Sequence, residues 1–239
     1  MNAQERIIVA LDVSSLGEAE PLVKELAPYV GCFKAGLQLL TSVGAPKVVE
    51  FLSGLGGKVF LDGKFGDIPN TMGEAAQAAA SLGVAMFNVH ASAGVEAMMA
   101  AVQHKGNSQV LAVTVLTSLE ENNAHLIFGA PSKAKVLQFA RDAKIAGVDG
   151  VICSPQELEL LGKQKELTGL LRVTPGVRPV WAAAGDQKRV MTPGDAIVAG
   201  ATALVIGRPI TKPPKEVGKP ADAARRIAEE IAIALERRG

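Results

Sequence analysis

Three charged side chains stand close together after an apolar run. The stretch VFLDGKFGDIPNT (59–71) begins with three apolar residues, which predict a buried strand, and continues with Asp62, Lys64 and Asp67. Asp62 and Lys64 are two positions apart, so on a continuing strand they point to the same side. Charges this near a core are costly unless they are paired, and a lysine beside two carboxylates favours its charged form. We therefore expect a functional site that places an ammonium group between carboxylates.

Further polar residues stand where other apolar runs end. They are Asp12, Lys34, His90, Thr117, Ser118, Gly207 and Arg208. Any one of them could simply cap a turn or a helix, but as a group they indicate a site, provided that the ends of the runs converge. Gly207 and Arg208 suit a phosphate, because glycine lets the backbone approach an anion and arginine donates two parallel hydrogen bonds. Gln187 could reach the same group.

The histidines are a weaker signal. His90, His104 and His125 include no pair with metal-ligand spacing, and the two cysteines form no CxxC motif. We therefore expect no zinc site. For His90 we expect a structural place or a subunit contact rather than a catalytic role.

Eight short apolar runs recur along the chain with helical patterns between them. The runs are 7–12, 31–36, 58–63, 86–91, 109–115, 149–154, 170–176 and 203–208. Continuous apolar runs are typical of parallel strands that are buried on both faces. Eight strand–helix units in 239 residues predict a (β/α)8 barrel, slightly below the usual size of roughly 250 residues. A doubly wound open sheet is the alternative fold, but it more often carries a glycine-rich fingerprint after its first strand, and ALDVSSLGEAE has none.

The segments between the runs complete this organisation. Helices are predicted over 17–29, 71–83, 133–147 and 222–238, and no linker or shift in composition divides residues 1–239, so we expect one domain. Two connections, 116–132 and 174–192, are too long for simple turns, and such loops are often functional lids or else disordered. Both follow strands, which places them on the C-terminal face, where barrel active sites lie.

Composition narrows the classes of function. The chain has 25 Lys and Arg against 24 Asp and Glu, so nothing general favours binding to nucleic acid or to an acidic membrane. Cys32 and Cys153 stand in short apolar runs, and we expect buried, reduced thiols. The N-terminus lacks a signal-peptide pattern, and no run of about 18 apolar residues occurs. We therefore expect a cytoplasmic protein that does not span a membrane.

The motif LDGKFGDIPNT resembles that of the orotidine 5′-phosphate decarboxylase family. The resemblance continues in VALD, FKAG, VTVLTS, TPGVRP, GDQKRVMTP and VIGRPI, which run in order from the first predicted strand to the last. It implies a (β/α)8 homodimer that converts orotidine 5′-phosphate to uridine 5′-phosphate and carbon dioxide in pyrimidine synthesis, without a metal or cofactor. Gly63 and Gly66 stand where many relatives carry a bulkier residue, but they remove no functional group.

The resemblance also implies roles for individual residues. Lys64 would donate the proton to C6, with Asp62 beside the departing carboxylate. Asp67 and Thr71 would reach into the neighbouring subunit's site, where Asp67 completes a charged network with Lys34, Asp62 and Lys64. The residues implied to bind substrate are Asp12, Lys34, Asp62 and Thr71 near the ribose and carboxylate, Thr117 and Ser118 at the pyrimidine, and Arg178, Gln187, Gly207 and Arg208 around the phosphate.

Two other functions stay open. A magnesium-dependent sugar-phosphate decarboxylase or aldolase of the same barrel superfamily also carries Asp-x-Lys-x-x-Asp. In that group an acidic metal ligand ends the second strand, where this chain has Lys34, which would repel a cation. A non-catalytic nucleotide-binding barrel would keep Arg208 and Gln187 but has no need of the charged residues at 62, 64 and 67.

Overall fold

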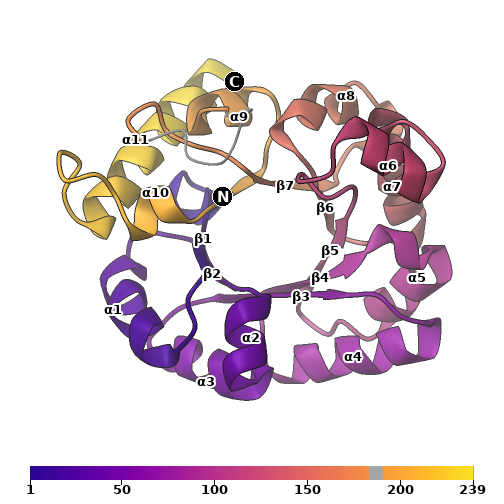
Figure 1. Ribbon diagram of the computed structural model, residues 1–239, viewed down its shortest axis with the longest axis horizontal. Coiled ribbons are helices and arrows are strands. Elements are labelled where there is room, and N and C mark those ends of the chain that lie inside the picture. The colour runs from indigo at the N-terminus through magenta and orange to yellow at the C-terminus, as the bar shows by residue number, and fades with distance from the viewer. Residues whose placement is uncertain (183–190, 239) are drawn as a thin grey trace.

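The computed structural model describes residues 1–182 and 191–238, and its centre is a closed barrel of parallel strands. Each strand pairs with the next along the chain, and β1 closes the ring by pairing with β8. The eight strands in this part of the chain are β1 Ile7–Leu11, β2 Cys32–Ala35, β3 Val59–Phe65, β4 Met86–His90, β5 Gln109–Val113, β6 Gly150–Ile152, β7 Leu171–Pro175 and β8 Ala203–Ile206. Figure 1 looks onto this ring. Every predicted strand is present, and the predicted (β/α)8 barrel is confirmed.

Helices surround the ring (Figure 1). They are α1 Leu16–Leu26, α2 Leu37–Val43, α3 Ala45–Gly54, α4 Pro69–Ser81, α5 Val95–Gln103, α6 Glu121–Phe128, α7 Ser132–Ala146, α8 Leu158–Gly162, α9 Pro193–Val198, α10 Arg208–Thr211 and α11 Pro220–Arg238. Short 3-10 turns are η1 Gln4–Arg6, η2 Ala91–Ala93, η3 Pro155–Glu157 and η4 Lys165–Leu167. The four helices expected from the sequence correspond to α1, α4, α7 and α11. None of the helices described is both long and apolar enough to cross a membrane.

The strands read as continuous apolar runs because, in most of them, residues on both faces are buried. In β1, Ile7, Val9 and Leu11 pack in the layer between the strands and the helices, whereas Ile8 and Ala10 point into the barrel. The barrel interior is filled by side chains, which are Ile8, Ala10, Cys32, Phe60, Leu111, Val173, Ala203 and Val205. The centre is therefore a packed core, and polar chemistry is displaced to the ends of the strands.

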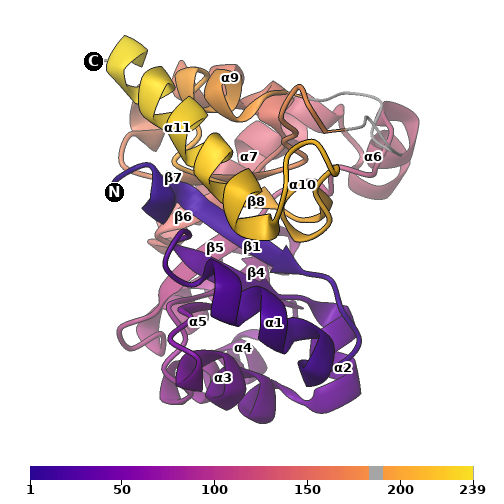
Figure 2. The same ribbon diagram turned by 90° about the vertical axis from the view of Figure 1, so that its left-hand side faces the viewer.

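The connections that follow β2, β5 and β8 lie on one side of the barrel. Figure 2 shows α2, α6 and α10 on the side away from the N-terminus, toward which β1 runs. The long connection 116–132 was expected to be a loop, and this is wrong, because it contains α6. The last residue of α6, Phe128, is followed by Gly129 in the left-handed conformation. That glycine is a common helix stop. In the second long connection Val177 bridges Met191 and α9 follows, while 183–190 lie outside the described residues.

Both cysteines are buried and free, as expected. Burial raises the pKa of Cys32 and of Cys153 to about 12. Both thiols therefore stay protonated at neutral pH and act as small apolar side chains.

One glycine controls how closely β6 and β7 approach. Gly150 pairs with Leu171, and a Cβ on Gly150 would lie 2.6 Å from both the Cβ and the carbonyl oxygen of Leu171. Such a contact with backbone forces the strands apart. A Cβ on Gly54, at the end of α3, would have no atom within 4 Å.

We predict that Gly150→Ala lowers the free energy of unfolding by about 1–3 kcal/mol, the usual range for overpacking. The control Gly54→Ala should be neutral or stabilise by up to about 1 kcal/mol, because alanine favours a helix. Urea denaturation followed by circular dichroism measures both. Equal stability of the two variants would contradict the close-approach argument.

Candidate active site

A buried carboxylate, Asp62, lies between two ammonium groups at the C-terminal end of the barrel. Lys34 Nζ is 2.9 Å from Asp62 Oδ2, and Lys64 Nζ is 2.6 Å from Asp62 Oδ1. The side chains of Asp62, Lys34 and Lys64 are 9%, 13% and 29% exposed. The expected pairing of Asp62 with Lys64 is therefore present, and Lys34 from the neighbouring strand completes it.

Asp12, after β1, extends this group toward solvent. Its Oδ1 accepts a hydrogen bond from Lys34 Nζ at 3.5 Å, and its side chain is 68% exposed. Gly36 makes room for the same ammonium group, because a Cβ there would lie 2.9 Å from Lys34 Nζ. The FKAG motif thus supplies both a cation and the space that the cation occupies.

The backbone of β3 is irregular where the site begins. Leu61 pairs with Phe87 and Phe65 pairs with Val89, so the register with β4 shifts between them. Lys64 has a φ of 50°, and it is the only non-glycine residue with positive φ in the described ranges. Asp62 and Lys64 do share a side, as the spacing indicated, but a bulge rather than a regular strand brings them together.

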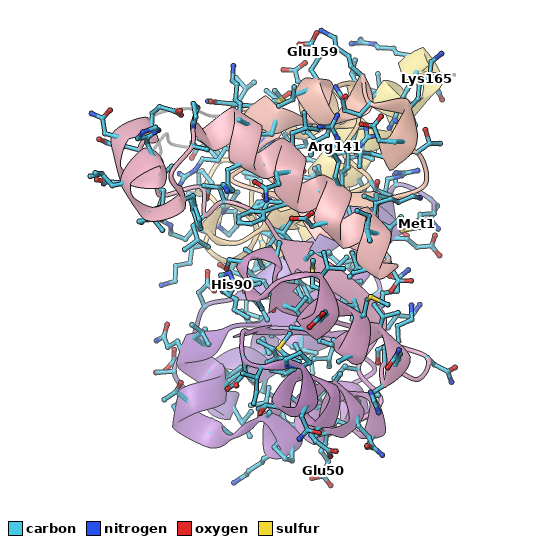
Figure 3. The ribbon with its side chains drawn as sticks, turned by 90° about the vertical axis from the view of Figure 1, so that its right-hand side faces the viewer. Met1, Glu50, His90, Arg141, Glu159 and Lys165 are labelled. Carbon is cyan, nitrogen blue, oxygen red and sulfur yellow. The ribbon has the colours of Figure 1, made fainter. Side chains whose placement is uncertain are left out.

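Asn88, on β4, is a site residue that the sequence reasoning missed. It is fully buried, and its side chain bonds to both Asp62 and the Lys64 backbone. The available signal was a lone amide inside the apolar strand MFNVH. His90 follows on the same strand, half-buried, and Figure 3 shows it on the side of the molecule opposite Met1.

The electrostatics keep Asp62 ionised and His90 neutral. Burial by itself raises the pKa of Asp62, but the charges of Lys34 and Lys64 and the Lys64 hydrogen bond outweigh it, so this pKa lies below the ordinary value. Burial, reinforced by the Lys64 charge, lowers the pKa of His90. At neutral pH the cluster therefore holds two cations and the Asp62 anion, with Asp12 at its solvent edge.

The residues predicted to bind the phosphate lie at or near the ends of β7 and β8. A Cβ on Gly207 would be 3.5 Å from Asp12 Oδ2, so the ends of β8 and β1 meet. Arg208 is exposed and begins α10. Arg178 is buried in the segment after β7, and its backbone N–H donates to the Met191 carbonyl oxygen. Gln187 lies outside the described residues.

The remaining predicted residues are exposed. Thr117 and Ser118 follow β5 on the surface. Thr71 lies in the first turn of α4, and Asp67 precedes that helix and accepts a hydrogen bond from the backbone of Ile68. Within the described chain Asp67 forms no ion pair with Lys34 or Lys64. The structure therefore brings together three members of the expected charged network, and the cross-subunit part of that hypothesis stays a prediction.

A second buried carboxyl group at this end of the barrel, that of Glu157, has a structural role. Glu157 caps the turn after β6, where its Oε2 accepts a hydrogen bond from the Ser154 backbone N–H at 2.8 Å. Burial raises the pKa of Glu157 to about 7. Across 1–182 and 191–238, no three His, Cys, Asp or Glu side chains gather as a metal ion would require.

The fold and the site together define a (β/α)8-barrel protein with a lysine–carboxylate site at the ends of its strands. Comparison with known proteins gives the family: the chain belongs to the Orotidine 5'-phosphate decarboxylase / HUMPS family, whose sequence model matches residues 5–227.

Individual relatives match over their full length. Orotidine 5'-phosphate decarboxylase from Heliobacterium modesticaldum is 46% identical and covers 100% of both chains. The protein of the same name from Syntrophomonas wolfei is 44% identical over 97% of this chain and 99% of its own. The crystal structure of orotidine 5'-phosphate decarboxylase from Lactobacillus acidophilus superposes with a TM-score of 0.79 at 33% identity, covering 94% of this chain and 98% of that chain.

Asp62 is buried and Asp12 is exposed, and this difference in burial leads to a prediction about stability. Asp62→Asn should lower the free energy of unfolding by about 3 kcal/mol at pH 7.5, because it leaves two largely buried ammonium groups without their shared anion. Asp12→Asn should change it by less than about 1 kcal/mol, as is usual for exposed pairs. Urea denaturation measures both.

The pH dependence follows from the lowered pKa of Asp62. The ionised carboxylate stabilises the fold above its unfolded pKa, about 3.9, and this contribution is lost as the pH falls through the lower folded value. The gap between the parent and Asp62→Asn should therefore narrow below about pH 4. A gap that stays constant down to acid unfolding would contradict this account.

Proposed function

We propose that the protein decarboxylates orotidine 5′-phosphate to uridine 5′-phosphate and carbon dioxide in pyrimidine biosynthesis. The observation that carries the proposal is the Asp62 carboxylate held between Lys34 and Lys64 at the C-terminal end of the barrel. Full-length relatives named orotidine 5'-phosphate decarboxylase support it. The two free, buried thiols suit a reducing compartment, and we place the enzyme in the cytoplasm.

Lys64 acts on the charge that develops during the reaction. When the bond between C6 and the carboxylate breaks, the electron pair stays on C6 and carbon dioxide leaves. A preorganised ammonium group stabilises negative charge developing beside it. Lys64 then transfers one proton from Nζ to C6, which completes uridine 5′-phosphate, and the neutral amine regains a proton from solvent.

Asp62 contributes by orientation and by repulsion. Its Oδ1 accepts the Lys64 Nζ hydrogen bond at 2.6 Å and so aims the ammonium group. Repulsion between this carboxylate and that of the substrate is roughly 4 kcal/mol at a separation of about 4 Å and an effective dielectric constant near 20. Enzymes lower barriers by about 8–23 kcal/mol. Repulsion alone is therefore too small, and charge stabilisation by Lys64 is the larger effect.

The site suits chemistry without a metal ion. Both oxygens of Asp62 are engaged by ammonium groups, one by Lys34 and one by Lys64. A magnesium ion bound at Asp62 would have to displace a lysine and lie beside the other one. Because Lys34 stands on β2 where a magnesium-dependent relative would carry an acidic ligand, the metal-dependent alternative fits these residues poorly.

The substrate spans the ends of the strands. Asp12 and Lys34 hold the ribose hydroxyls, Thr117 and Ser118 face the pyrimidine, and Arg178, Gln187, Gly207 and Arg208 surround the phosphate. Phosphate binding beyond strands seven and eight is usual in these barrels. The binding energy of the phosphate, which lies away from the reacting carbon, is used to order the site around C6.

The active form is a homodimer with shared sites. Asp67 and Thr71 are exposed in this chain, and Ile68 between them is 65% exposed although it is apolar. An exposed segment of this kind suits an interface, across which Asp67 reaches the partner's Lys34 and Lys64 and Thr71 reaches the partner's ribose site.

The reaction and the role of Lys64 are tested together. Purified protein should consume orotidine 5′-phosphate, seen as a loss of its absorbance, and should do so undiminished in excess chelator. Lys64→Ala should stay folded by circular dichroism and lose at least a thousandfold in kcat, because both charge stabilisation and proton donation disappear. Turnover within tenfold of the parent would remove Lys64 from the mechanism, and activity lost to the chelator would favour the magnesium-dependent alternative.

Sharing of sites across the interface predicts complementation. Lys64→Ala and Asp67→Ala should each be nearly inactive, because every site then lacks one of the two residues. After complete subunit exchange roughly half of the dimers are mixed, and each mixed dimer has one intact site. Activity should therefore return to about a quarter of the parental value. Mass spectrometry of the dimers confirms exchange, and continued inactivity of the exchanged mixture would place Asp67 in its own subunit's site or outside the site.

A further inference from the structure

Asn88 stands where the pairing of β3 with β4 is interrupted, and none of the roles above uses it. Leu61 pairs with Phe87 and Phe65 pairs with Val89. The residues of β3 between these pairs, 62–64, therefore face a single residue of β4, which is Asn88. It is 0% exposed.

The Asn88 side chain uses both ends of its amide. Its Nδ2 donates to Asp62 Oδ1 at 2.6 Å, and its Oδ1 accepts from the Lys64 backbone N–H at 2.7 Å. Lys64 Nζ donates to the same Asp62 Oδ1 at 2.6 Å. Asn88, Asp62 and Lys64 thus form a closed ring of hydrogen bonds, and a shift in one residue displaces the other two.

The ring includes the strained backbone of Lys64. A φ of 50° is unfavourable for a residue with a side chain, and it persists only where the surroundings hold it. The Asn88 Oδ1 accepts the hydrogen bond of that very N–H. If Lys64 relaxed to an extended conformation, its side chain would leave the direction that brings Nζ to Asp62.

We propose that Asn88 is a positioning residue, which holds Asp62 and the Lys64 backbone so that the Lys64 ammonium group faces the reacting carbon. This inference rests on the proposed decarboxylase function. Once Lys64 has given up its proton, its amine is a weaker partner for Asp62. The neutral amide still donates to Asp62 Oδ1 and keeps the carboxylate in place until Lys64 is protonated again.

An amide is the side chain that this position requires. One donor must meet Asp62 and one acceptor must meet the Lys64 N–H, and asparagine supplies both without charge. An apolar residue would remove one hydrogen bond from Asp62 and would leave the Lys64 backbone N–H without its acceptor. A carboxylate would keep the acceptor but place a second negative charge against Asp62.

The first test separates kcat from KM on orotidine 5′-phosphate. Asn88→Ala should lower kcat by about 10- to 100-fold, the scale of a small misplacement of a catalytic group. KM should change less than about threefold, because Asn88 lies away from the phosphate residues. The matched control is Ser108→Ala, which removes a buried hydroxyl that donates to the Val84 carbonyl oxygen beside the start of β5. That variant should keep the parental kcat.

The second test is a pH profile of Asn88→Asp. The charged and titratable groups around this position are Asp62 and Lys64 of β3, Lys34 of β2, Asp12 after β1, and His90 on β4. At low pH the new carboxyl is protonated, and its O–H donates to Asp62 as the amide does. As the pH rises it loses that proton, so the donor is replaced by a negative charge. The ratio of variant to parental kcat should therefore fall at least tenfold between pH 5 and pH 9, which a merely structural loss would not produce.

The outcomes distinguish the inference from the function on which it rests. A parent without decarboxylase activity overturns the proposed function itself. An active parent, with Asn88→Ala within threefold of its kcat or with Asn88→Asp showing a constant ratio across the pH range, overturns the positioning role. Should Asn88→Ala fail to fold, the pH comparison within Asn88→Asp decides. Failure of both variants to fold at every pH would assign Asn88 to the fold and also overturn the proposal.

Discussion

The structure of the site depends on keeping one buried carboxylate ionised. An ion the size of a carboxylate costs several kcal/mol to remove from water, and here Lys34 and Lys64 hold both oxygens of Asp62 while Asn88 donates to one of them. That pairing uses two cations from neighbouring strands, and a bulge in β3 directs one of them, Lys64.

The closed barrel is what makes such pairing possible. Parallel strands all end on the same side, and closure brings β8 against β1 as well as β1 against β2. Residues separated by most of the chain, such as Asp12 and Gly207, therefore become neighbours. The side chains below them in the barrel interior are apolar, and a surrounding of low dielectric strengthens the charge interactions at the rim. The apolar residues that stabilise the fold thus lie inside the barrel, and the charged residues of the site lie at the C-terminal ends of its strands.

The residue at the C-terminal end of β2 sets the charge beside Asp62. A carboxylate there would favour a metal ion beside Asp62, whereas an ammonium group repels one. In this chain that residue is Lys34, which lies 2.9 Å from Asp62. A single change of charge on a neighbouring strand would therefore alter which ligands this site can hold.

The sequence alone determined the barrel and the main charged residues. Continuous apolar runs indicate strands that are buried on both faces, so the strands could be predicted. A charged residue at the end of such a run must be paired with an opposite charge, so Asp62, Lys64 and Lys34 could be predicted as site residues. It did not indicate α6, the left-handed Lys64 or the place of Asn88. Those depend on contacts between strands: the register of β3 against β4 decides which residue faces the bulge, and no local pattern encodes that register. Only the folded barrel brings the amide of Asn88 to the two groups that need it.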